Sequence, residues 1–309
     1  MAHIVVPEAE ALLDQPIAVL DKGFVRLVDY LGGDARIVAA ARVSYGAGTK
    51  TAREDRALIH YLFRNAHTSP FEQVQLTFHC KLPIFVARQW IRHRTARLNE
   101  LSGRYSVMRD EFYVPDGARV ALQSEENKQG SGDSVTPQYA ARVLELLKAE
   151  QAALYTDYSG MVEAGVAREL ARINLPLSLY TEWYWQIDLH NLFHFLRLRL
   201  DPHAQYEIRQ YAAALAQCAQ AVAPLAYEAF EEYELYGARF SKTELRLIRD
   251  MLKNAGISPE SDLGALSKLP AKRREEFARK LWGAGPAAGG IEVPDFKPAQ
   301  RDEPPAPAD

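Results

Sequence analysis

The chain has 309 residues, of which 48% are hydrophobic and 10% aromatic, so it can bury a sizeable core in one large or two ordinary domains. Its formal net charge of -3 excludes a polycation built to coat nucleic acid. The N-terminus lacks the pattern of an export signal, and the longest uncharged run contains glutamines and a proline, which disfavours a membrane span. We therefore expect a cytoplasmic protein with no membrane or nucleic-acid partner.

The first third of the chain predicts alternating strands and helices. In chain order these are a strand over 24–30, a helix over 35–42, a helix from 51 to about 65, a turn over 67–72, a half-buried strand over 74–82 and a helix that starts at Pro83. Asp34 stands where it would cap the first helix, and Thr51 with Glu54 forms a capping-box pattern. The residues after the last of these helices are expected to form a charged loop.

The remaining sequence predicts mostly helix. In chain order we expect a polar excursion over 115–137, a long core helix from Thr136-Pro137 and an aromatic strand over 179–187. A helix from Asp188 to Arg199 or Leu200 should follow, and then helices over about 203–222 and 225–237. The last two expected helices are one capped by Ser241 and Glu244 and one over about 271–282. The Gly-, Ala- and Pro-rich tail 283–309 predicts disorder. The fold class is therefore α+β: a small, mainly antiparallel sheet flanked by helices, with a larger helical part.

Cysteine catalysis and metal binding are both disfavoured. Cys80 lies on the apolar side of the strand over 74–82 and Cys218 in an alanine-rich helix, so neither has the electropositive surroundings that activate a thiolate. Two cysteines without paired spacing predict neither a zinc site nor a disulfide framework, as is usual in a reducing cytoplasm.

A dense group of arginines marks the stretch from Arg88 to Arg109, which holds six arginines against one acid, Glu100. Arginine stays charged, and its planar fork of donors suits phosphate oxygens. The interleaved Trp90 and Tyr105 favour a wall that is partly packed and partly lines a cavity, although a solvated basic helix face is the alternative. A small anionic ligand fits this local charge on a nearly neutral chain.

This stretch closely resembles the signature of flavin-dependent thymidylate synthases, in which Arg-His-Arg is followed, after seven residues, by a serine within Asn-Glu-x-Ser-x-Arg-Tyr. The corresponding residues are Arg92-His93-Arg94 and Asn99 to Tyr105. The family also carries Glu-x-x-Arg, then Pro, an aromatic strand, and a helix that ends Leu-Arg-Leu before His-Ala-Gln; Glu169 to Arg172 and His203 to Gln205 match it. The resemblance covers about residues 20–235.

The resemblance implies an enzyme that converts dUMP to dTMP without a covalent protein nucleophile. FAD is the implied cofactor, NADPH the reductant and 5,10-methylenetetrahydrofolate the one-carbon donor. Family members are homotetramers whose sites gather residues from several subunits. Residues 1–240 would then form a single catalytic domain, followed by a helical C-terminal extension over 241–282.

Carried over residue by residue, the resemblance implies a set of site residues and no metal ligands. Arg199 would be catalytic, because a fixed cation at the uracil ring stabilises negative charge on it. The implied FAD-binding residues, with His67 nearby, are Ser69, Arg92, His93, Arg94, Glu100, Asp188, Leu189, His190 and His194. The implied dUMP-binding residues are Gln89, Trp90, Ile91, Arg92, Glu100, Leu101, Ser102, Gly103, Arg104, Arg172 and Arg199.

Several alternatives stay open at this point. His67 could instead be a histidine that caps its turn. Some members of the family have asparagine at the positions of Asp188 and His194. The arginine run could be the phosphate clamp of a nucleic-acid-binding module with Trp90 and Tyr105 for stacking, or part of a flavoprotein with another substrate. A nucleophilic Ser102 is rejected, because no Gly-x-Ser-x-Gly elbow surrounds it.

Overall fold

The computed structural model describes residues 4–43, 52–125, 130–258 and 269–283, and for 52–54 the backbone alone. The chain divides into two compact units, Met1–Gly237 and Ala238–Asp309. The predicted capping box at Thr51 and Glu54 and the tail beyond Gly283 lie outside the described residues and side chains. The assignment of 1–240 to one catalytic domain and 241–282 to an extension stays a prediction.

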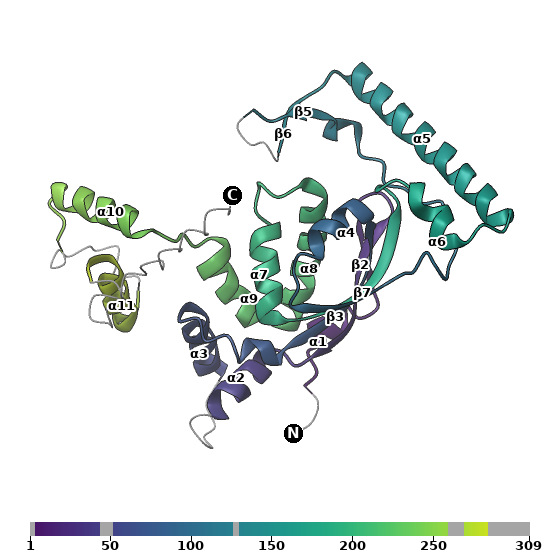
Figure 1. Cartoon of the computed structure of the whole chain (residues 1–309). Helices are drawn as coiled ribbons and strands as arrows, with labels where there is room; N and C mark the ends of the chain where they lie inside the picture. The colour runs from purple at the N-terminus through teal and green to yellow at the C-terminus, as the bar shows by residue number, and fades with distance from the viewer. Residues whose placement is uncertain (1–3, 44–51, 126–129, 259–268, 284–309) are drawn as a thin grey trace, which may run out of the picture. The chain divides into compact units, whose positions relative to one another are not determined.

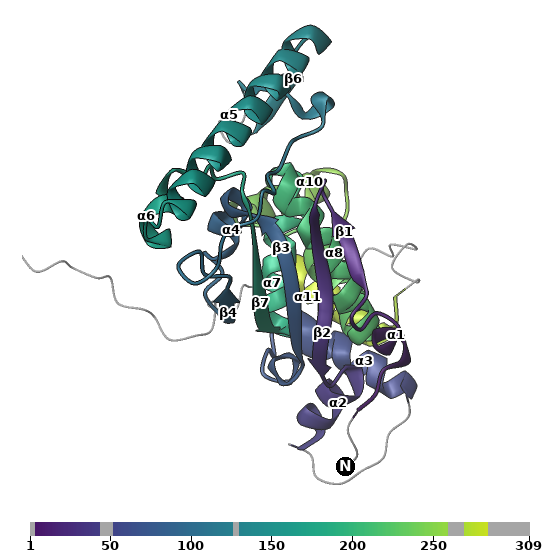
Figure 2. The same cartoon turned by 90° about the vertical axis from the view of Figure 1, so that its right-hand side faces the viewer.

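A five-stranded antiparallel sheet forms the centre of the first unit. Its strand order is β1 (Pro16–Val19), β2 (Gly23–Leu31), β3 (Gln75–Pro83), β7 (Tyr180–Asp188) and β4 (Ala96–Glu100). Figure 2 shows α7 (Leu189–Arg199) and α8 (Tyr206–Val222) behind one face of this sheet. The α+β prediction is confirmed.

The remaining helices of the first unit are α1 (Pro7–Glu10), α2 (Asp34–Arg42), α3 (Ala52–Arg64), α4 (Ile84–Trp90), α5 (Pro137–Glu163), α6 (Arg168–Ala171) and α9 (Pro224–Phe230), with short 3-10 turns η2 (Phe71–Gln73), η3 (Gly117–Arg119) and η4 (Arg172–Asn174) and a π-helical turn η5 (Glu231–Leu235). In Figure 1, α1, α2 and α3 lie toward one end of this two-layer arrangement, and α5 and α6 lie toward the other. Among the described residues, no helix is long and apolar enough to cross a membrane.

The core between the sheet and its helices is built around a fully buried indole. Trp90 lies edge-on to Trp183 and Trp185 of β7, with ring centroids 5.3 and 5.1 Å away, and its centroid is 5.0 Å from that of Phe195 of α7. Aromatic contacts of this geometry add to the stabilisation from burying their area. The end of α4, the centre of β7 and the middle of α7 are therefore fixed relative to one another.

Three local predictions were wrong. The charged loop after α4 contains the edge strand β4, which pairs with β7 from Ala96 opposite Ile187 to Glu100 opposite Trp183. The polar excursion contains a small hairpin, β5 (Ala121–Gln123) with β6 (Ser131–Ser134). The helix α5 is mostly exposed and contributes only Ala140, Gln151 and Tyr158 as buried residues, because it packs mainly against the short elements α6, η3 and η4 and not against the sheet.

The described part of the second unit, residues 238–258 and 269–283, contains the helices α10 (Lys242–Asn254) and α11 (Ala271–Trp282). The predicted capping box is present: the Ser241 hydroxyl accepts from the Glu244 N–H at 3.2 Å, and the Glu244 carboxylate accepts from the Ser241 N–H at 2.6 Å. The Arg249 guanidinium on α10 donates to the Gly283 carbonyl after α11 at 2.6 Å. The Arg249 hydrogen bond thus links α10 to the C-terminal end of α11.

Asp34 caps a different helix from the one predicted. Its carboxylate accepts hydrogen bonds from the N–H groups of Leu225 and Ala226, at 2.8 and 3.0 Å, in the first turn of α9. Helix α2, which begins at Asp34, has no side-chain cap. The first turn of α9 has free N–H groups that need an acceptor, and a carboxylate there is also favoured by the helix dipole.

We predict that Asp34→Ala lowers the free energy of unfolding by about 1 kcal/mol, because two partly buried N–H groups lose their acceptor. Urea unfolding followed by circular dichroism measures this. The matched control is Asp29→Ala, since Asp29 is exposed on the neighbouring strand β2 and its carboxylate forms no hydrogen bond with a described residue. An equal loss in both variants would contradict the capping role.

Candidate active site

One group of predicted site residues gathers at the C-terminal half of α7. We call His93, His194 and Arg199 the α7 group. The Arg199 Nε donates a hydrogen bond to the His93 Nε2 at 3.1 Å, and the His93 and His194 rings have centroids 6.1 Å apart. His93 also lies edge-on to Phe195, with a centroid distance of 4.7 Å. The loop after α4 is thus held against α7.

The hydrogen bond from Arg199 defines the protonation of His93. An Nε2 atom that accepts a hydrogen bond carries no proton, so the His93 ring is neutral with its hydrogen on Nδ1. Burial, the Arg199 charge and His194 lower the pKa of His93 to about 4. The His93 ring is therefore neutral throughout the physiological pH range, so it does not offset the positive charge of Arg199.

We predict that Arg199→Ala raises the pKa of His93 toward the ordinary histidine value, because a nearby positive charge is removed. Histidine Cε1 chemical shifts, followed by NMR from pH 4 to 8 and assigned with His93→Gln, measure this. Arg197→Ala is the control: Arg197 lowers the pKa of His194 and is ion-paired with Glu234 at 3.4 Å. A His93 that titrates near pH 6.5 in the unaltered chain would contradict the neutral-ring assignment.

A second group lies where β4 ends. We call residues 101–108 the β4 loop, and Glu100, Ser102, Gly103, Arg104 and Arg172 the β4-loop group. A Cβ built on Gly103 would lie 3.0 Å from the Arg172 Cδ, so the arginine side chain packs directly on the loop backbone. The Ser102 Oγ accepts from the Arg104 N–H at 3.3 Å. The loop and the η4 turn therefore form one surface.

A cavity of about 260 Å³ opens beside the β4-loop group. Glu100, Leu101, Gly103 and Arg172 line it, together with Glu169 and several apolar residues of the second, smaller core. The Glu100 carboxylate is held at its edge by the Thr181 hydroxyl, 2.8 Å away on β7. The cavity combines an apolar floor with a cation and two carboxylates, which is the usual composition of a small-ligand site.

The arginines of the signature divide into paired and unpaired ones. Arg104 forms an ion pair with Glu169 at 3.2 Å, and Arg109 forms one with Glu182 at 3.1 Å. Arg104 is one of the arginines expected to contact ligands; no carboxylate among the described residues pairs with the other four, namely Arg92, Arg94, Arg172 and Arg199. Unpaired guanidinium groups that are held in place are available to bind an anion.

The α7 group and the β4-loop group lie at opposite ends of β4. His93 precedes the strand, which starts at Ala96, and Ser102 follows its last residue, Glu100. The strand itself separates the two ends by about 14 Å, from the rise of about 3.4 Å per residue. No hydrogen bond or ion pair joins the two groups within the described part of the chain.

Two predicted residues are buried, so that only their backbone is available to a ligand. The Trp90 and Leu189 side chains are both 0% exposed and belong to the core. The stacking role that the nucleic-acid alternative gives to Trp90 is excluded for this chain by that burial. Of their predicted neighbours, Ile91 is exposed, and the Gln89 amide donates a hydrogen bond to the Gln205 side chain.

The other predicted flavin contacts lie near the start of α7 or in the turn before β3. The Asp188 carboxylate caps α7 by accepting from the Asn191 N–H at 2.9 Å, and it also accepts from the Asn191 side chain. His67 forms no side-chain hydrogen bond with a described residue and stacks on Tyr61 at 5.9 Å, so it does not cap its turn through its side chain. His67 and Ser69 are both exposed.

Sequence reasoning missed three residues that shape the site. The Thr181 hydroxyl donates a hydrogen bond to the Glu100 carboxylate, and the Gln205 side chain accepts one from the Gln89 amide. The Met108 sulfur packs against Gly103. The family pattern contains Gln205 but gave it no contact. Thr181 could have been found only from the pairing register of β4 with β7, which places Glu100 and Trp183 opposite each other.

Comparisons with known proteins identify the family. The family model described as thymidylate synthase complementing protein matches residues 26–225. The flavin-dependent thymidylate synthase of Treponema denticola is 59% identical over 270 residues, covering 87% of this chain and 98% of that protein. The enzyme of the same name from Thermus thermophilus is 56% identical over 273 residues, covering 88% and 97%.

This chain belongs to the flavin-dependent thymidylate synthase family. The expectation drawn from the Arg92-His93-Arg94 signature is thereby confirmed. Among solved structures, the UMP/dUMP methylase PolB from Streptomyces cacaoi bound with 5-Br dUMP is similar with a TM-score of 0.65 and 32% identity, covering 72% of this chain and 100% of that one. Neither comparison assigns roles to individual residues of this chain.

Proposed function

We propose that this flavin-dependent thymidylate synthase methylates dUMP to dTMP at a site composed of the α7 group and the β4-loop group. FAD is the cofactor, NADPH the reductant and 5,10-methylenetetrahydrofolate the one-carbon donor. The observation that carries the assignment of the site is that its unpaired arginines occupy two fixed positions, beside His93 and beside Gly103. The structural likeness to a methylase of UMP and dUMP supports a pyrimidine nucleotide as the substrate.

The β4-loop group is the proposed dUMP-binding surface. The Ser102 hydroxyl and the guanidinium groups of Arg104 and Arg172 would hold the phosphate, because charge-assisted hydrogen bonds to phosphate oxygens are the strong ones. Glu100 and Leu101 line the cavity beside them, where the nucleoside would lie. The contacts to dUMP would be completed from the other end of β4 by Gln89, the backbone of Trp90, Ile91 and Arg92.

The exposed side of α7 is the proposed flavin-binding surface. His190 and His194 are one helical turn apart, and His190 contributes to the lowered pKa of His194. From Leu189 to Arg199 the helix extends about 15 Å, which suits an elongated dinucleotide. Arg92 and Arg94 fit its pyrophosphate, and Ser69, His67, Glu100 and Asp188 would border the pocket.

Arg199 is the proposed catalytic residue. Carbon C5 of the uracil becomes nucleophilic as the ring gains electron density, and a fixed cation beside the ring stabilises that charge. Burial lowers the pKa of Arg199, but arginine stays protonated at neutral pH, and the neutral His93 orients its Nε. Bound reduced flavin supplies the hydride that completes the methyl group.

Neither thiol replaces this chemistry. Cys80 and Cys218 are both buried, and burial raises the pKa of each thiol, so neither is available as a nucleophile. Covalent attack on the uracil ring by cysteine is therefore not part of the proposed reaction. The free cysteines also support the expected cytoplasmic location.

The complete site would be shared between subunits of a homotetramer. Within one chain the α7 group and the β4-loop group lie at opposite ends of β4, about 14 Å apart along the strand. A second copy that presents its β4 loop to the α7 group of the first would bring Arg172 and Arg199 to the same ligand. The exposed Leu98 and Tyr184 on the β4 edge of the sheet are compatible with such packing.

We predict that the purified protein is yellow, that dUMP changes its flavin absorbance, and that Arg199→Ala removes at least 99% of dTMP formation while FAD stays bound. The physical reason is that the variant loses charge stabilisation of the uracil but keeps the flavin surface. Product analysis by chromatography and the flavin spectrum measure the two effects. Turnover retained in Arg199→Ala would remove its catalytic role, and a wild-type spectrum that does not respond to dUMP would contradict the proposed substrate.

We also predict that mixing two inactive variants restores activity. Arg199→Ala chains keep an intact β4-loop group and Arg172→Ala chains keep an intact α7 group, so mixed oligomers contain some sites with both groups intact. The variants are unfolded together, refolded as a mixture and assayed for dTMP, with each variant refolded alone as the control. Sites built within a single chain would give no recovery.

A further inference from the structure

Two tyrosines of α5 hold the backbone of one residue in the β4 loop. The Met108 N–H donates a hydrogen bond to the Tyr158 hydroxyl at 2.9 Å, and the Tyr155 hydroxyl donates to the Met108 carbonyl at 3.0 Å. Tyr158 is 1% exposed and Met108 is 5% exposed. Both polar groups of Met108 are therefore satisfied by a single helix, and losing either partner leaves a buried group unsatisfied.

Met108 in turn supports the part of the loop that is proposed to hold the phosphate. A Cβ on Gly103 would lie 2.9 Å from the Met108 sulfur and 3.0 Å from the Arg172 Cδ, so both side chains pack against the same backbone atom. A shift of Met108 would therefore displace Gly103 or remove the packing contact that holds it. Arg172 would follow, because its side chain has no ion-pair partner among the described residues and is positioned by this packing.

The contacts that hold the loop from α6 are weaker. Arg104 and Glu169 form an exposed ion pair at 3.2 Å, and such pairs contribute little in water. The Arg168 guanidinium donates to the Tyr105 carbonyl at 2.9 Å, but it also lies at the surface. The buried Tyr158 bond and the partly buried Tyr155 bond are thus the stronger attachment of the loop.

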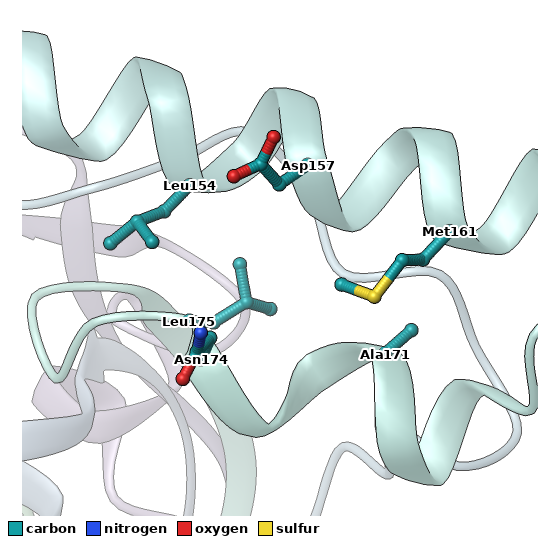
Figure 3. A pocket seen from close by; sticks show the side chains of 6 residues that line it. All are labelled: Leu154, Asp157, Met161, Ala171, Asn174 and Leu175. Carbon is teal, nitrogen blue, oxygen red and sulfur yellow. The ribbon is translucent and has the colours of Figure 1, made fainter.

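A cavity separates α5 from the segment that carries Arg172. Its volume is about 330 Å³, and Figure 3 shows Leu154, Asp157 and Met161 of α5 facing Ala171, Asn174 and Leu175 across it. Tyr155 and Tyr158 provide the hydrogen bonds that link α5 directly to the β4 loop.

We propose that Tyr155 and Tyr158 are positioning residues for the nucleotide phosphate: through Met108 they fix the β4 loop and Arg172 in the arrangement that binds dUMP. This inference rests on the proposed function of the β4-loop group. It assigns to α5, whose residues carry none of the family signature, the task of setting substrate affinity. The flavin surface along α7 does not contact these tyrosines.

The test is the binding of dUMP and of deoxyuridine to Tyr158→Phe and Tyr155→Phe, measured on the FAD-loaded enzyme by isothermal titration calorimetry. Each variant should bind dUMP about 10-fold more weakly, as expected when a buried hydrogen bond is lost. Deoxyuridine, which lacks the phosphate, should lose much less affinity, and FAD content should stay unchanged. Turnover at saturating dUMP should fall less than twofold, so that KM changes and kcat does not.

Two substitutions on the same helix serve as matched controls. Tyr139→Phe removes a hydroxyl from an exposed tyrosine, and Leu154→Ala loosens the packing of α5 at the cavity without touching Met108. Unchanged dUMP affinity in both tyrosine variants, or equal weakening in Leu154→Ala, would overturn the proposal. If Tyr158→Phe fails to fold, the less buried Tyr155→Phe decides. A wild-type enzyme that does not bind dUMP would instead refute the proposed function itself.

Discussion

The pairing of β4 with β7 is the interaction on which both halves of the site depend. It fixes Ala96 opposite Ile187 and Glu100 opposite Trp183, so the loops before and after β4 leave the sheet at set points. The strand β7 also continues through Asp188 into α7, which carries Arg199 at its other end. The same strand therefore positions the His93 loop, the Ser102 loop and Arg199, and the aromatic contacts of Trp90 stiffen this arrangement.

The arginines of this chain illustrate how a fold separates structural charge from functional charge. Arg197 and Arg109 have acidic partners at 3.4 and 3.1 Å, which neutralise them locally. Arg199 instead has a neutral histidine as its neighbour. A carboxylate in that place would stabilise the guanidinium but would cancel much of its field at a ligand. A histidine with a lowered pKa orients the arginine and leaves its charge available.

Elements with a local pattern could be predicted from the sequence. The alternating strand β3, the Asp188 cap and the capping box at Ser241 and Glu244 all depend on neighbours in the chain. Edge strand β4 could not be predicted, because it is short, charged and exposed, and its partner lies about 90 residues away. The candidate site residues were predicted from the family resemblance, which gives positions but does not tell that a side chain such as that of Trp90 is buried in the core. The contacts of Met108 leave no local signal, since they arise where α5 meets the loop.

The distant partner of Asp34 has a consequence for how the protein is made. The amides that its carboxylate binds belong to Leu225 and Ala226, which emerge from the ribosome 191 and 192 residues later. The centre of the sheet likewise waits for β7, because β3 pairs with it from Gln75 to Pro83. Folding during synthesis would therefore stall with the N-terminal strands unpaired on one side until most of the catalytic unit has been translated. Until β7 has been made, one edge of β3 therefore keeps its backbone N–H and C=O groups without their partner strand.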